Sequence, residues 1–188
     1  VGMKNIGGKG VTSAVATAEA VFDEARAIAV GKGTKARVLV DVSDPNDNQN
    51  YKRRMFVAYQ ELDEQGQAKE NWIVASRAIS LPDKTFFSST YSKKDHTTGS
   101  QLEELQMNFD KNIFNGTFAY YEFNSEGIST TPKASFVVGT GIRPTGQEPR
   151  ATADGKRDFG GFLVWRNGRT SMFRGPDEIG IPSQVTTF

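Results

Sequence analysis

The side chains best suited to catalysis are few and scattered along this sequence of 188 residues. The single histidine, His96, lies in a polar stretch from Lys93 to Gly99, and the sequence has no cysteine. Thiol catalysis and cysteine-ligated metals are therefore excluded, and the neighbours of His96 lack the spacing of a catalytic triad. Carboxylate pairs can always be found among 22 acidic residues, so they indicate no particular hydrolase. We expect no enzyme activity and no cofactor.

One loop has the beginning of a calcium-binding pattern. Asp44, Asn46 and Asn48 place side-chain oxygens at alternate positions, as an EF-hand loop does at its start. The pattern then breaks, because the sixth position is Gln49 instead of glycine and the twelfth is Met55 instead of glutamate. We therefore predict no metal site here, but a loop whose short polar side chains bond to the backbone.

The charge of the chain favours no polyanionic partner. Its 23 Lys and Arg residues balance 22 Asp and Glu residues, for a net charge of +1. A basic group at 52–54 could join aromatic side chains in a nucleic-acid groove, but strand alternation would turn Arg53 and Arg54 to opposite faces. We expect no nucleic-acid partner.

The first ordered element is predicted to be an amphipathic helix over 12–31. Thr12 or Ser13 can cap its start, and the step Gly31-Lys32-Gly33 can end it. Apolar residues recur every three or four positions between these ends, which gives one apolar stripe. Those we expect to make helix packing or assembly contacts are Val15, Val21, Phe22, Ala25, Ile28 and Ala29. Residues 1–11 are rich in glycine and are predicted to be a flexible lead-in.

The remainder of the chain has the pattern of antiparallel strands. Short runs rich in β-branched and aromatic residues are separated by turn formers, and Asn167-Gly168 is a strong hairpin signal. The predicted strands are 37–42, 54–62, 72–79, 86–91, 117–123, 135–138, 162–166 and 170–174. A helical turn is predicted at 101–107, and a long surface loop over 139–160.

These elements predict one globular domain over 12–188. Its fold class is α+β and mainly β, with the N-terminal helix packed on an antiparallel β region over 36–188. The number of strands also leaves open an immunoglobulin-like sandwich. Because no run approaches the roughly 18 apolar residues of a membrane span, the residues given predict no transmembrane segment.

The order of these elements resembles the type IV pilin-like family, in particular minor pilins and pseudopilins without their N-terminal transmembrane segment. The resemblance lies in a helix end, a first strand, a turn and a closing hairpin, namely Ala25–Ala29, Arg37–Val40, Phe123–Gly127 and Trp165–Arg169. The family's leader-peptidase site and hydrophobic anchor would precede Val1.

The resemblance implies a structural subunit of a bacterial type IV pilus or type II secretion-like filament. Its partners would be other pilin-like subunits, and a missing N-terminal helix would anchor the exported precursor in the inner membrane before display at the cell surface. The alternative is a surface-exposed adhesive or ligand-binding β-sandwich. That alternative would bind a host protein or glycan through its aromatic residues and long loops.

Overall fold

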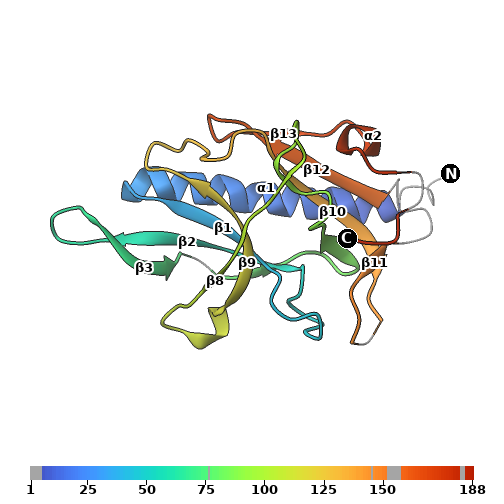
Figure 1. Cartoon of the computed structure of the whole chain (residues 1–188), viewed down its shortest axis with the longest axis horizontal. Coiled ribbons are helices and arrows are strands. Elements are labelled where there is room, and N and C mark those ends of the chain that lie inside the picture. The colour runs from blue at the N-terminus through green and yellow to red at the C-terminus, as the bar shows by residue number, and fades with distance from the viewer. Residues whose placement is uncertain (1–5, 76, 145, 152–157, 183–184) are drawn as a thin grey trace.

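The computed structural model consists of one long leading helix followed by antiparallel strands (Figure 1). It describes residues 6–75, 77–144, 146–151, 158–182 and 185–188. In these ranges no helix has both the length and the apolar character needed to cross a bilayer. The predicted α+β class, with the helix packed on antiparallel sheets, is confirmed.

Helix α1 spans Ile6–Lys32 and is therefore longer at its start than the sequence predicts. The predicted flexible lead-in is wrong from Ile6 onward, and residues 1–5 lie outside the described residues. Glycine costs a helix roughly 1 kcal/mol per residue relative to alanine. Tertiary contacts offset this here, because Val11 is buried against Gly160, where an added Cβ would lie 2.6 Å from the valine side chain. Packing on the sheet extends the helix through its glycines.

The end of α1 agrees with the predicted stop. Gly33 has a φ of 63°, in the left-handed region that glycine adopts without strain. Its N–H donates to the carbonyl of Val30 at 3.3 Å, and the N–H of Thr34 donates to the carbonyl of Ala29 at 3.1 Å. These two bonds are the Schellman motif, and they direct the chain from the helix into the first strand.

The first sheet has the strand order β3-β2-β1-β9-β8, with β4 also paired to β2. All of its pairings are antiparallel. Its strands are β1 (Ala36–Asp41), β2 (Arg54–Leu62), β3 (Ala68–Val74), β4 (Ile79–Ser80), β8 (Glu104–Met107) and β9 (Gly116–Phe123). The helical turn predicted at 101–107 is wrong. Residues 104–107 form β8 instead, because their backbone pairs with β9.

The second sheet has the order β11-β10-β12-β13, with β5 also paired to β10. Its strands are β5 (Thr85–Phe87), β10 (Ala134–Ile142), β11 (Arg150–Ala151), β12 (Phe159–Val164) and β13 (Thr170–Met172). A separate hairpin joins β6 (Lys93–Asp95) to β7 (Ser100–Gln101), and the short helices are η2 (Asn112–Phe114) and α2 (Pro176–Ile179). Part of the loop predicted over 139–160 is instead strand, since β10 and β12 extend into it and β11 lies within it. Residues 145 and 152–157 of that prediction lie outside the described residues.

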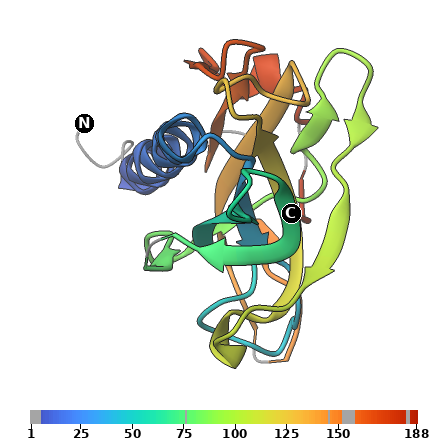
Figure 2. The ribbon, with the colours of Figure 1, turned by 90° about the vertical axis from the view of Figure 1, so that its left-hand side faces the viewer.

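Helix α1 lies on one side of the molecule and contacts strands of both sheets (Figure 2). The main core is made of apolar side chains from α1, β1, β2, β9, β10 and β12. An immunoglobulin-like sandwich would instead pack its two sheets directly on each other. That alternative is not the arrangement of the described residues, because the helix fills the position of a facing sheet.

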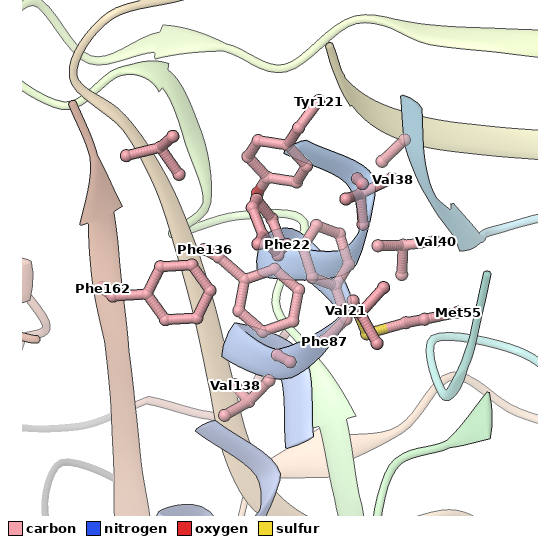
Figure 3. Close-up of a cluster of buried hydrophobic side chains, with 14 of the residues drawn as sticks. Val21, Phe22, Val38, Val40, Met55, Phe87, Tyr121, Phe136, Val138 and Phe162 are labelled. Carbon is pink, nitrogen blue, oxygen red and sulfur yellow. The ribbon is translucent and has the colours of Figure 1, made fainter. Parts of the chain in front are cut away.

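Phe22 lies at the centre of this core (Figure 3). Its ring is in edge contact with Tyr121 at 4.8 Å, Phe162 at 5.0 Å, Phe136 at 5.5 Å and Phe123 at 6.4 Å between centroids. Such pairs add about 0.5–1.5 kcal/mol each to the free energy of burial. One helical side chain therefore joins strands of both sheets.

Tyr121 makes the stability of this core depend on pH. Its hydroxyl donates to the carbonyl of Ser135 at 2.6 Å, and complete burial raises the pKa of its phenol well above the ordinary 10.0. The stabilisation is complete below pH 10, where unfolded tyrosine keeps its proton, and is lost as pH rises further.

Between pH 10 and pH 11 we expect the wild-type protein to lose about 1 kcal/mol more unfolding free energy than Tyr121→Phe. Urea unfolding at pH 7, 10 and 11 measures this difference. At pH 7 we expect the wild-type protein to be more stable than Tyr121→Phe, because the variant lacks a hydrogen bond that contributes about 1 kcal/mol. Equal losses of unfolding free energy in the two proteins above pH 10 would contradict the raised pKa of Tyr121.

Candidate functional site

The outer face of α1 is exposed along much of the helix. Five exposed residues follow one another at steps of four and three positions, so they form a single stripe along the helix. We call them the outer stripe: Ala16, Ala20, Asp23, Ala27 and Val30. Val30 keeps 51% of its surface exposed, and Asp23 is the single charge in the stripe. The stripe is narrow, mostly apolar, and made of side chains small enough for another helix to approach closely.

The six residues predicted for helix packing or assembly lie on the opposite face. Val15, Val21, Phe22, Ala25 and Ala29 are at most 5% exposed, and the partly buried Ile28 packs against the same cluster. These side chains are occupied within the domain. They are therefore not available to another protein, and the exposed face of α1 is the outer stripe, which the apolar periodicity did not identify.

Polar contacts on the flanks of α1 fix the direction in which the outer stripe faces. Glu19 accepts a hydrogen bond from the hydroxyl of Thr170 at 2.6 Å, and Nε of Arg26 donates to the carbonyl of Asn167 at 3.1 Å. Both partners belong to the hairpin of β12 and β13. The helix therefore cannot rotate about its axis without breaking bonds to the second sheet.

The turn of that hairpin needs glycine at Gly168. Its φ is 81°, and an added Cβ would lie 2.4 Å from the carbonyl oxygen of Gly127 and 2.6 Å from Arg26. We expect Gly168→Ala to lower the free energy of unfolding by about 2–3 kcal/mol, measured by urea denaturation. Gly175→Ala is the control, because that position has an extended φ of −172° and no atom within 4 Å of the new methyl group. Equal stability of the two variants would refute the role of the turn.

Two of the metal candidates in the Asp44 loop accept hydrogen bonds, Asp44 from the loop itself and Asn48 from Arg143. Asp44 Oδ1 accepts the backbone N–H of Asn46 at 2.9 Å, and Asn48 Oδ1 accepts a hydrogen bond from Arg143. Burial disfavours the charge of Asp47, but hydrogen bonds from Asn50 and Gln49 outweigh it and lower the pKa of Asp47. No group of three or more acidic or histidine side chains within the described ranges is arranged to hold a metal ion. These short side chains support the turns of the connection from β1 to β2.

His96 has contacts of a structural kind. Its Nε2 lies 3.0 Å from the carbonyl oxygen of Glu178, and its ring lies 5.0 Å from that of Phe173. The histidine thus attaches the β6–β7 hairpin to the segment around α2. It is not paired with a nucleophile among the hydrogen bonds of the described residues.

The basic group at 52–54 is divided among separate partners. Lys52 is buried and lies 3.5 Å from Glu148, and burial lowers the pKa of its amine against the opposing effect of that carboxylate. Arg53 donates to the carbonyl of Leu81 at 2.8 Å, and Arg54 pairs with Asp41 at 2.8 Å. These side chains do not form a shared basic patch.

A groove of about 440 Å³ lies beside the end of β3, on the face of the first sheet that points away from α1. Its walls come from the end of β3 and from the connection between β8 and β9, and we call it the β3 groove. The residues lining it are Trp72, Ile73, Val74, Ala75, Arg77, Phe109, Asp110, Lys111 and Phe114. Its volume is within the range of small-ligand and side-chain sites. The sequence analysis missed it, because its two walls lie far apart along the chain.

No protein-family model and no curated protein matches this sequence. The structure is similar to the solved structure of the type IV minor pilin FimU of Pseudomonas aeruginosa, with a TM-score of 0.44, 12% identity and 93% of each chain covered. It is also similar to the minor pseudopilin EpsH of the type 2 secretion system of Vibrio cholerae, with a TM-score of 0.44 and 13% identity over 88% of this chain and 97% of that chain. These are the families that the sequence resembles.

Proposed function

We propose that this protein is a structural, pilin-like subunit of a type IV pilus or type II secretion-like filament. The observation that carries the proposal is the division of α1 into two apolar faces. One face is buried in the β domain and the other, the outer stripe, is exposed. We infer that this exposed stripe is the surface on which a neighbouring subunit packs. The small side chains of Ala16, Ala20 and Ala27 would let a neighbouring helix pack closely.

The proposal includes export, display at the cell surface and a membrane-anchored precursor. These parts are supported by the sequence resemblance. We expect the gene upstream of the codon for Val1 to encode a leader peptide and about 20 apolar residues. An upstream sequence without such a segment would contradict the anchor.

The absence of cysteine allows a direct test of the outer stripe. In the full-length protein expressed in its own host, we expect Ala20→Cys to form cross-links to neighbouring subunits when treated with a short bifunctional thiol reagent. Gln101→Cys is the matched control, since this exposed residue lies on the β6–β7 hairpin, away from α1 (Figure 2). Its cross-linking yield should be at least tenfold lower. Equal yields, or cross-links from the control alone, would contradict assembly through the helix.

A second variant measures the contribution of the stripe to assembly. Ala20→Arg adds a long charged side chain to an exposed helix position, so the free energy of unfolding should change by less than about 0.5 kcal/mol. Incorporation into filaments, measured by immunoblotting of sheared surface fractions, should fall strongly because the arginine keeps a neighbouring helix at a distance. Normal incorporation of Ala20→Arg would place the interface elsewhere on the subunit.

A further inference from the structure

Strand β3 is an edge strand, and the direction of its backbone groups follows from its neighbours. The backbone N–H of Gln60 in β2 donates to the carbonyl of Lys35 at 2.9 Å, on the side of β1. Val57 accepts the N–H of Ala75 at 2.8 Å, on the side of β3. Because backbone groups alternate between the two sides of a strand, the odd-numbered residues of β2 bond toward β3.

The register between the two strands completes this assignment. Tyr59 pairs with Ile73, so the backbone of Ile73 faces β2. The N–H and C=O groups of its neighbours Trp72 and Val74 must then point outward, away from the sheet. Among the hydrogen bonds of the described residues, none is donated by the outward N–H groups of Trp72 and Val74.

The two halves of this edge differ in their protection against pairing. Lys69 and Glu70 in the first half are exposed charges, which natural proteins use to block an edge strand. The segment Trp72–Val74 has no charge, no proline and no bulge, since the irregularity in the β2 pairing lies before it. The second half is therefore open to another strand at the position where the β3 groove begins.

The β3 groove provides a site for side chains next to this open backbone. Its lining includes the apolar side chains of Trp72, Val74 and Phe114. It also includes two cations, Arg77 and Lys111, and one carboxylate, Asp110, and we call these three charged residues the rim. The guanidinium of Arg37 lies over the ring of Trp72, 4.0 Å from its centroid. This cation–π contact restricts the ring of Trp72, and the rim carries two basic side chains and one acidic side chain.

We propose that the edge of β3 and the β3 groove together bind an extended, acidic peptide segment of a partner protein by β-strand addition. The peptide backbone pairs with the outward groups of Trp72 and Val74, as in other complexes of this kind. One apolar side chain of the peptide occupies the groove. An acidic residue lies against Arg77 and Lys111. A glycan does not present donors and acceptors at the spacing of a strand, so the open backbone favours a peptide. The site is separate from the outer stripe and does not depend on the proposed function.

The test begins with a phage-displayed random heptapeptide library selected against the folded protein. We expect the selected sequences to alternate apolar and polar residues and to include Asp or Glu. A synthetic peptide of the consensus sequence should slow amide hydrogen exchange of Trp72 and Val74 at least tenfold. It should leave the exchange of Ile73 unchanged, since that N–H is already bonded to β2.

Two variants of one residue isolate the backbone contact. Val74→Pro removes an outward N–H without removing a bond between β2 and β3, and proline is tolerated at such edge positions. Val74→Thr changes the same side chain but keeps the N–H. We expect Val74→Pro to bind the consensus peptide about tenfold more weakly than Val74→Thr, as the loss of one hydrogen bond predicts.

The rim is tested by Lys111→Glu, which reverses an exposed charge. Repeating the selection on this variant should yield peptides without the acidic preference. Three outcomes would overturn the proposal: no selected peptide, equal binding to Val74→Pro and Val74→Thr, or exchange protection away from β3. The proposal would also be overturned if a glycan bound in the groove with the same affinity for the wild type and Val74→Pro. That result would assign the groove to a sugar.

Discussion

Replacing Phe22 with alanine is expected to lower the free energy of unfolding by about 3–5 kcal/mol. The side chain is fully buried and contacts aromatic rings of both sheets, so its removal leaves a cavity that these rings cannot all move to fill. Small domains have only about 5–15 kcal/mol of stability in total. The variant should therefore be marginal at 37 °C, which thermal and urea denaturation will show.

Phe22→Leu is the matched control for this prediction. Leucine keeps most of the apolar volume and loses the edge contacts between rings, so we expect a smaller loss of about 1–2 kcal/mol. If Phe22→Ala costs less than about 1 kcal/mol, the helix is not the element that joins the two sheets.

The second large effect is expected for Asp41→Ala, with a loss of about 3–5 kcal/mol in the free energy of unfolding. Asp41 lies 2.8 Å from Arg54, and the two side chains are only 5% and 12% exposed. Asp41 also accepts the N–H of Ser43 at 2.9 Å. Alanine would leave the guanidinium with its charge uncompensated in a position that water hardly reaches, which is the main cause of the loss.

A double variant separates the pair from its individual members. Asp41→Ala combined with Arg54→Met removes both charges, so the double variant should be more stable than Asp41→Ala alone. Urea denaturation of the wild type, the two single variants and the double variant gives the coupling energy. Additive losses would show that the two side chains do not depend on each other.

The elements predicted correctly are those whose signals are local. The apolar stripe of α1, its glycine stop and the Asn167-Gly168 turn each depend on residues within a few positions of one another. β2 was predicted with the observed bounds, Arg54–Leu62, because its apolar and β-branched residues are continuous. In each case the physical cause is a contact between neighbours in the chain.

The errors have a common origin in contacts over long sequence distances. The helix begins at Ile6, before the predicted start, and Val11 near this end is buried against Gly160 on a distant strand. The local run of glycines predicts a flexible segment instead. Residues 104–107 pair with β9 despite a sparse apolar pattern that suggested a helical turn. Tertiary pairing overrides weak local propensity in both segments.

The same distinction applies to the sites. The sequence by itself determined which face of α1 is apolar enough to be buried, since that follows from the period of the helix. Only the tertiary structure decided that the outer stripe of Ala16, Ala20 and Ala27 is left uncovered. It also decided that Phe114 lies beside Trp72 to form the β3 groove. Burial and exposure depend on which distant segments of the chain pack together, and local patterns in the sequence do not specify this packing.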